Sequence, residues 1–188
     1  YTVGIDEAAF YGPKLDIQCK NVFGKEDTIV TIQIDMLLAK KFGMEYTDSN
    51  DKRVTPYIIH RTSLGCYERT LALVLEKFAG ALPLWMAPEQ VRILPIGVEH
   101  VEYAKKVADE LDRKYDLRVS VDERNEKIGY KIREAQLGKV PYMLVVGDNE
   151  AAENAVAVRR RGEGDLGQMS IADFGAKAVK EVKDLVLN

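Results

Sequence analysis

Hydrophobic and polar residues alternate along two early segments of the chain, as they do in strands that are buried on one side only. The segments comprise residues 14–20 and 27–36, and Gly24 marks a turn between them. We therefore predict an antiparallel hairpin with one apolar and one polar face. The polar face of the second segment carries Thr31, Gln33 and Asp35. The pattern alone favours a polar face that is directed towards water.

Residues 57–80 predict a strand, a turn and a helix. Residues 57–59 form a short apolar strand, after which the chain is expected to turn at His60, Arg61 and Gly65. A helix follows, because apolar residues recur at steps of three and four, namely Leu71, Val74, Leu75 and Phe78. Gly80 lies just past the last of these and is a usual stop signal for a helix.

Two charged residues, Glu68 and Arg69, fall in the first turn of this predicted helix. A cation fixed at a strand–turn–helix junction, beside an imidazole and a glycine, is suited to binding a planar, phosphorylated ligand. The spacing fits equally well a buried helix with a polar start, so the pattern leaves both interpretations open.

From Val91 onward, apolar segments of strand length alternate with amphipathic segments of helix length. Strands are expected at residues 91–96, 117–121, 140–146 and 155–159, and helices at residues 100–115, 126–137 and 171–186. Such alternation predicts an α/β fold with a mostly parallel sheet, which follows a first part of α+β type. Prolines punctuate the passage between the two patterns. We therefore expect a boundary within residues 87–90, with domains at 1–88 and 89–188.

The composition is that of an ordinary soluble globular protein, with 46% hydrophobic and 30% charged residues in a chain of 188. No apolar run has the length of a membrane span and no signal peptide is visible, so we expect a cytoplasmic location and no membrane partner. Cys19 and Cys66 match no zinc or redox spacing and are expected to be reduced. The net charge of −3 means that RNA binding requires a local basic patch. Because the chain starts at Tyr1 without a methionine, we expect a fragment of a longer protein.

Four short sequences occur in the order, and with the gaps, of one known family. Leu-Gly-Cys-Tyr-Glu-Arg (residues 64–69) resembles motif 3 of the class II aminoacyl-tRNA synthetases, and the preceding Ile-His-Arg resembles the threonyl-tRNA synthetases. The other three are Ala-Phe-Tyr-Gly-Pro-Lys (9–14), Thr-Ile-Gln-Ile-Asp (31–35) and Asn-Glu-Lys-Ile-Gly-Tyr-Lys-Ile-Arg-Glu (125–134). The resemblance covers essentially the whole chain. It implies the end of a class II catalytic domain, with an antiparallel sheet, followed by an anticodon-binding domain.

The resemblance implies that the polar face of the hairpin lines an active site for ATP, with magnesium, and threonine. Arg69 matches the motif 3 arginine, which packs against adenine and touches the phosphates, and a planar, permanently charged guanidinium suits both contacts. Lys14 and Tyr11 match positions that line the ATP and threonine sites. Gln33 and Thr31 lie on the polar face, and Gln33 matches a position near the bound amino acid. Arg69 and Lys14 are the expected catalytic residues.

His60 matches one of three zinc ligands of the family, the others being a cysteine and a second histidine. Zinc there engages the amino and hydroxyl groups of threonine, which excludes valine. The resemblance places the two missing ligands, and motifs 1 and 2, upstream of Tyr1. Without the resemblance, a histidine at a strand end is more often a structural, hydrogen-bonded residue.

In the second domain, Asn125, Lys139 and Glu150 match positions that read anticodon bases. Lys139 stands where an arginine is expected and lacks its bidentate fork, so a base contact and a phosphate contact both stay open. Further basic residues are candidates for phosphate contacts or for solvated surface charge: Lys127, Lys131, Arg133 and Arg159 to Arg161.

The resemblance implies part of an ATP-dependent ligase that joins threonine to its tRNA, from a parent enzyme that is a homodimer. A second interpretation is a tRNA-binding or RNA-binding module with a vestigial, non-catalytic synthetase half. A third, another small-molecule enzyme on a class II-like sheet, is disfavoured by the anticodon-domain sequences. A cysteine and a histidine in ligand context upstream, with a motif 2 arginine, would favour the complete enzyme.

Overall fold

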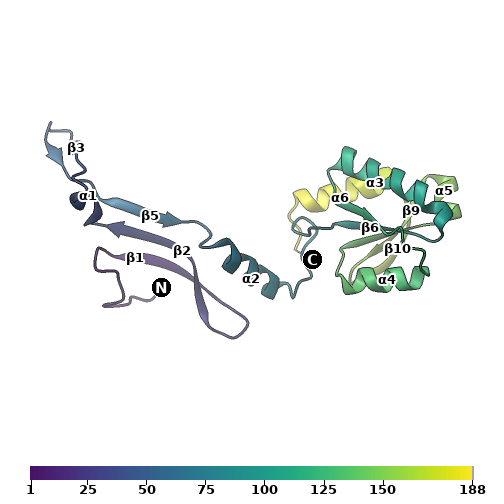
Figure 1. Ribbon diagram of the computed structural model, residues 1–188, viewed down its shortest axis with the longest axis horizontal. Coiled ribbons are helices and arrows are strands. Elements are labelled where there is room, and N and C mark those ends of the chain that lie inside the picture. Colours follow the sequence, from purple (N-terminus) through teal and green to yellow (C-terminus); the bar gives the residue numbers. More distant parts are fainter. Residues whose placement is uncertain (188) are drawn as a thin grey trace. The chain divides into compact units, whose positions relative to one another are not determined.

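The computed structural model describes residues 1–187, and its internal contacts divide the chain into two compact units, Tyr1–Lys77 and Phe78–Asn188 (Figure 1). The expected boundary at residues 87–90 lies about ten residues beyond this division. Residues 78–90 belong with the second unit by their packing: Leu84 lies in its core, and the buried Gln90 donates a hydrogen bond to the Leu84 carbonyl. Arg118 donates two more, to the carbonyls of Ala87 and Trp85.

The first unit is built on a three-stranded antiparallel sheet in the order β1 (Lys14–Lys20), β2 (Glu26–Asp35) and β5 (Ile58–Thr62). The remaining elements are α1 (Leu38–Lys41), the small hairpin of β3 (Tyr46–Thr47) and β4 (Arg53–Val54), and α2 (Tyr67–Lys77). The predicted hairpin is confirmed, with Lys14 opposite Gln33 and Asp16 opposite Thr31. The turn predicted at His60 and Arg61 is wrong, because these residues pair with β2 and extend β5 to Thr62.

The first unit has almost no hydrophobic core of its own. Within residues 1–77, all of which the structure describes, Ala39 is the only buried apolar residue. Leu15, Ile17 and Ile59 lie on the apolar face of the sheet, yet they are 58%, 50% and 67% exposed. The strand pattern therefore specifies this sheet correctly, although the described chain does not cover its apolar face.

The second unit contains a five-stranded sheet in the order β10-β9-β8-β6-β7. Its strands are β6 (Val91–Pro95), β7 (Val119–Val121), β8 (Tyr142–Val146), β9 (Ala155–Arg160) and β10 (Gly164–Ser170). Strands β7, β6 and β8 are parallel, whereas β9 and β10 add antiparallel pairs at one side. The predicted α/β fold is confirmed.

Helices cover both faces of this sheet (Figure 1). Helices α3 (Val101–Tyr115) and α6 (Ile171–Lys183) lie on one face and α4 (Ile128–Leu137) on the other. The larger core cluster lies under α3 and α6, where the rings of Tyr142 and Phe174 meet edge to face with centroids 5.3 Å apart. Two short helices, η1 (Val98–His100) and α5 (Asp148–Glu153), follow β6 and β8. Strand β10 and helix α5 were not predicted from the sequence.

Among residues 1–187, no helix combines the length and the apolar character that crossing a lipid bilayer requires.

Candidate functional site: a polar cleft and a strand edge

An open cleft of about 580 Å³ lies on the polar face of the first unit's sheet. Its lining includes all five residues that the sequence suggested for ATP and substrate: Tyr11, Lys14, Thr31, Gln33 and Arg69. Tyr11 comes from the segment that leads into β1, Lys14 is the first residue of β1, Thr31 and Gln33 lie in β2, and Arg69 lies in α2. Residues that are separated by up to 58 positions therefore meet in one place, as a binding site requires.

Hydrogen bonds order the polar side chains of the cleft. The Tyr11 hydroxyl donates to Gln33 Oε1 at 3.2 Å, and the Thr31 hydroxyl donates to Asp16 Oδ1 at 2.8 Å. Lys14 Nζ lies 2.7 Å from Asp16 Oδ2. This contact raises the pKa of Lys14 and lowers that of Asp16, so both groups are charged at neutral pH. Asp16 was missed from the sequence, although its place two residues after Lys14 on the same strand face was a signal.

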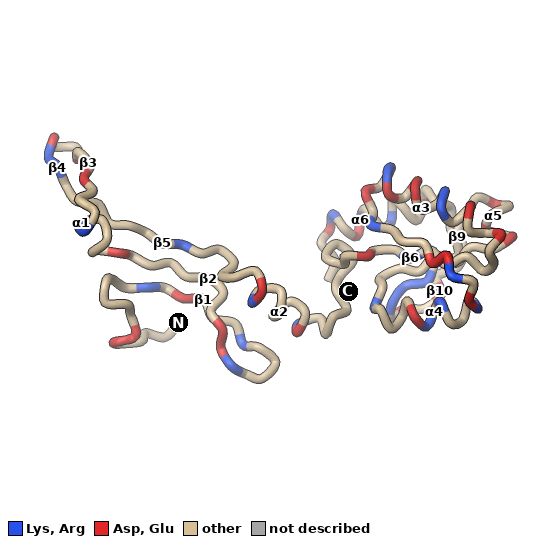
Figure 2. Tube along the Cα trace, viewed as in Figure 1, with Lys and Arg blue, Asp and Glu red and all other residues tan. Residues whose placement is uncertain are grey.

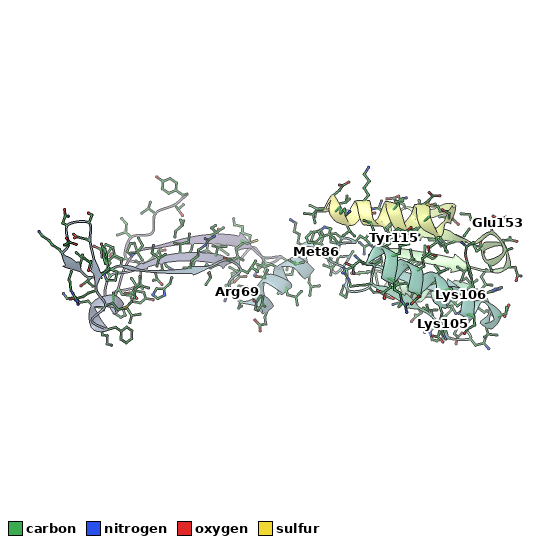
Figure 3. All side chains as sticks on the ribbon, turned by 90° about the horizontal axis from the view of Figure 1, so that it is seen from above. Arg69, Met86, Lys105, Lys106, Tyr115 and Glu153 are labelled. Atoms are coloured by element: carbon green, nitrogen blue, oxygen red, sulfur yellow. The ribbon has the colours of Figure 1, made fainter. Side chains whose placement is uncertain are left out.

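Arg69 lies in the first turn of α2, and its Nη1 donates to the Thr28 carbonyl at 2.9 Å (Figure 3). The preceding turn brings α2 close to β2 at Gly65, which has a φ of +63°. A Cβ at this position would lie 3.1 Å from the Ile29 carbonyl oxygen, so a side chain here would push α2 away from the strand. Gly65 thus sets the distance between the guanidinium and the sheet.

The segment that carries Tyr11 is fixed against β2 by backbone contacts. The amides of Ile34 and Met36 donate to the carbonyls of Pro13 and Tyr11, at 3.0 and 2.9 Å. Gly12 allows this approach, because a Cβ at Gly12 would lie 1.8 Å from the Ile34 carbonyl oxygen. Tyr11 therefore has a fixed place over the polar face.

His60 is opposite Gln33 in the sheet, and it does not line the cleft. Its Nε2 lies 3.1 Å from Oδ2 of the buried Asp35. Asp35 also accepts hydrogen bonds from the amides of Leu38 and Leu37, which together with His60 lower the pKa of its carboxyl group. A carboxylate that orients an imidazole is the usual support of a metal-binding histidine, so His60 fits the role of one zinc ligand. No group of three or more histidine, cysteine or acidic residues among residues 1–187 could hold a metal ion.

In the second unit, the structure brings together two of the three residues suggested for base reading. Asn125 follows β7 and Glu150 follows β8, and both strands run parallel to β6 between them. The two residues therefore lie at the same edge, outside the carboxyl ends of the strands, where ligands of open α/β sheets bind. Glu150 Oε2 accepts a hydrogen bond from the Gly147 amide at 3.0 Å, which ties it to the turn after β8.

Lys139 lies at the opposite end of the sheet, because it precedes β8 rather than following it. Its ammonium donates a hydrogen bond to the Ala79 carbonyl in the segment that enters the second unit. The structure therefore does not bring Lys139 to the edge that carries Asn125 and Glu150. The sequence could not reveal this separation, because it depends on which way β8 runs.

Several of the suggested phosphate contacts have protein partners instead. Lys131 is 2% exposed and donates to the carbonyls of Pro95 and Asp122, at 2.9 and 3.0 Å. Arg160 pairs with Glu181 at 2.8 Å, and Arg161 donates to backbone carbonyls only. Lys127, just before α4, and Arg133, on α4, are both exposed. Basic and acidic residues are interspersed along the second unit (Figure 2), so phosphate binding there would rest on few residues.

Comparison with known proteins assigns the two units to two families. The family described as tRNA synthetase class II core domain (G, H, P, S and T) matches residues 2–78, and the family described as anticodon binding domain matches residues 90–181. The two matched ranges follow the division into two units.

Among curated proteins, the chain is 57% identical over 182 residues to the threonine–tRNA ligase of Clostridium perfringens. It is 48% identical over 180 residues to that of Porphyromonas gingivalis. These alignments cover 97% and 96% of this chain, and 28% and 27% of the relatives' own length.

Among solved structures, the chain is similar to the RNA binding domain of threonyl-tRNA synthetase from Cryptosporidium parvum, with a TM-score of 0.82 and 37% identity. The match covers 93% of this chain and 44% of that one. The two family matches, the relatives and the similar solved structure all indicate the same family. The chain belongs to the threonyl-tRNA synthetase family.

Proposed function

We propose that the chain is part of an ATP-dependent ligase that activates threonine and transfers it to its tRNA. The observation that carries the proposal is the cleft of the first unit, which collects Tyr11, Lys14, Thr31, Gln33 and Arg69 on one polar surface. Activation of an amino acid is attack of its carboxylate on the α-phosphate of ATP. This reaction needs alignment and neutralisation of charge more than it needs a protein nucleophile.

The residues of the cleft would bind different parts of the two substrates. The Arg69 guanidinium, fixed through Thr28, offers a flat cationic surface for the adenine and the phosphates of ATP, which would enter with magnesium. Lys14 offers a second cation and is held by Asp16 until an anionic ligand replaces that contact. Tyr11, Gln33 and Thr31 offer hydroxyl and amide groups for the amino acid.

His60 would contribute one ligand to a zinc ion, with Asp35 holding the imidazole in place. Zinc, when bound, supplies a Lewis acid for the amino and hydroxyl groups of threonine. The described residues provide one such ligand, so we expect the isolated 188 residues to contain little zinc and not to activate threonine.

The second unit would bind the anticodon of a threonine tRNA at the edge that carries Asn125 and Glu150. Unpaired loop bases expose donors and acceptors that amide and carboxylate groups can read. Lys139 lies at the other end of the sheet, where its charge suits a phosphate better than a base. We further propose that the parent protein is a cytoplasmic homodimer.

The test uses the full-length parent protein and threonine-dependent exchange of pyrophosphate into ATP. Arg69→Ala should lower exchange severely, because the change removes both the flat surface and the charge. Arg113→Ala is the matched control, since Arg113 lies on the exposed surface of α3 with Asp109 as its partner. Near-normal exchange by Arg69→Ala would remove Arg69 from the site. Binding of tRNA without any exchange by the parent would instead support an RNA-binding module.

A further inference from the structure

A second arginine, Arg124, is held in a fixed plane directly beside Asn125. Its Nε donates to Asp122 Oδ1 at 2.8 Å and its Nη2 donates to Asp122 Oδ2 at 2.7 Å. Two parallel bonds of this kind fix the orientation of the guanidinium, and the carboxylate neutralises its charge. The Arg124 guanidinium therefore has a fixed orientation and a flat face, and its charge is paired with Asp122.

The carboxylate that holds Arg124 is itself fixed in the fold. Asp122 is 8% exposed, and its amide donates to the Ile93 carbonyl of β6 at 2.9 Å. Its carbonyl accepts a hydrogen bond from the buried ammonium of Lys131 at 3.0 Å, and the same ammonium bonds the Pro95 carbonyl. Strands β6 and β7 and helix α4 thus determine together where the guanidinium lies.

An aromatic ring lies next to the guanidinium of Arg124. The guanidinium carbon of Arg124 lies 5.7 Å from the centroid of the Tyr130 ring. The Arg124 side chain is 49% exposed and Tyr130 is 46% exposed, so both remain open to a ligand. Arg124 also lines an open hollow of about 530 Å³ together with Arg92, Ser120 and Glu134. Space for a ligand therefore lies beside the guanidinium, next to the half-exposed ring.

We propose that Arg124 and Tyr130 form a stacking platform for an unpaired base of the RNA loop that binds at this edge. Unstacked RNA bases are recognised by stacking on aromatic rings and on guanidinium planes, while neighbouring polar groups read their edges. Asn125, the next residue, is placed to read such an edge. A phosphate contact is the weaker interpretation of Arg124, because Asp122 already neutralises the charge and uses two of its N–H groups. The inference rests on the proposed tRNA binding and adds the residues that hold a base.

The test measures binding of the 188-residue chain to a threonine tRNA over a series of salt concentrations. Tyr130→Leu should weaken binding about tenfold, within the usual range for loss of one stacked base, and leave the salt dependence unchanged. Tyr130→Phe keeps the ring and should retain most of the affinity. Lys127→Ala, at a suggested phosphate contact, should reduce the slope of log K against log salt by about one. Arg113→Ala is the surface control, and urea unfolding followed by Trp85 fluorescence verifies that each variant is folded.

A second series locates the base. Transcripts with a single abasic position in the anticodon loop are compared on the wild-type chain and on Tyr130→Leu. At one position the wild-type chain should lose about tenfold while Tyr130→Leu loses nothing further, because the stacked base is already without its partner. If Tyr130→Leu loses as much affinity as the wild-type chain at every abasic position, the stacking platform is overturned. A smaller slope of log K against log salt for Arg124→Met would also overturn it, because that slope would show that Arg124 contacts a phosphate. If the wild-type chain binds no tRNA at all, the proposed tRNA binding fails, and the platform fails with it.

Discussion

Arg161 connects the segment that enters the second unit to the sheet, and its removal offers a direct measure of that connection. Its guanidinium donates to the carbonyls of Ala81 and Leu82, at 3.0 and 2.7 Å, and to the carbonyl of Lys139. Burial and the neighbouring charge of Arg160 lower the pKa of Arg161, whereas the carboxylate of Glu181 acts in the opposite direction. The side chain therefore acts through hydrogen bonds to the backbone rather than through an ion pair.

We estimate the effect of Arg161→Ala from these three bonds. A hydrogen bond within a protein contributes about 1 kcal/mol net, so the loss of three lowers the free energy of unfolding by about 3 kcal/mol. With a urea dependence of about 2 kcal/mol per molar for a unit of this size, the midpoint should fall by about 1.5 M. Arg161→Lys, which lacks the fork that reaches three carbonyls, should fall between Ala and wild type.

The assay is urea unfolding of the 188-residue chain followed by tryptophan fluorescence. Trp85 is the single tryptophan of the sequence and lies in the second unit, so its emission reports on that unit alone. Arg113→Ala, at an exposed ion pair on α3, should change the free energy of unfolding by less than about 0.5 kcal/mol. A midpoint for Arg161→Ala that equals that of Arg113→Ala would refute the argument that these carbonyl contacts stabilise the unit.

Three further predictions follow from the fold. A polypeptide of residues 78–188 should unfold cooperatively, whereas residues 91–188 lack both the buried Leu84 and the Ala81 and Leu82 carbonyls that Arg161 binds. Loss of that burial and of two hydrogen bonds, about 4 kcal/mol in all, should lower the urea midpoint by about 2 M, and equal midpoints would contradict the packing of that segment. Gly12→Ala should displace the backbone beside the Ile34 carbonyl and lower threonine-dependent exchange by the parent at least tenfold, while an unchanged rate would show that the loop can adapt. The bonds from Arg124 lower the pKa of Asp122 below 3.8, so its contribution to stability is complete above that pH and is lost as pH falls through the lower folded value. Asp122→Asn should therefore flatten the acid limb of a plot of unfolding free energy against pH, and an unaltered limb would exclude this pair as its cause.

Local pattern predicted most of the elements, because alternation and helical spacing act over a few residues. The hairpin of β1 and β2, helix α2 and the strand–helix order of the second unit all appear where the sequence indicated. Strand β10 was missed because glycines at 164 and 167 interrupt its alternation, and its partner β9 is what makes it a strand. The end of β5 was misplaced for a similar reason, since His60 and Arg61 are strand residues only through their pairing with β2.

The candidate site, like the fold, could be predicted from the sequence only where it depends on local sequence and not on contacts between distant residues. Resemblance brought Tyr11, Lys14, Thr31, Gln33 and Arg69 to attention, and the sheet register explains why they share a cleft. Lys139 could not be placed from the sequence, because its position depends on strand direction within a sheet. The roles of Lys131 and Arg161 were also hidden, since a basic residue looks the same in sequence whether it faces a phosphate or a buried carbonyl.

The uncovered apolar face of the first unit determines how the chain behaves at high concentration. Its sheet has free edges at β1 and β5, and the neighbouring apolar side chains are exposed, which is the arrangement that favours association between chains. We expect light scattering to rise with concentration for the whole chain but not for residues 78–188. Low protein concentration, or a mild detergent that covers the apolar face, should therefore keep the whole chain from associating.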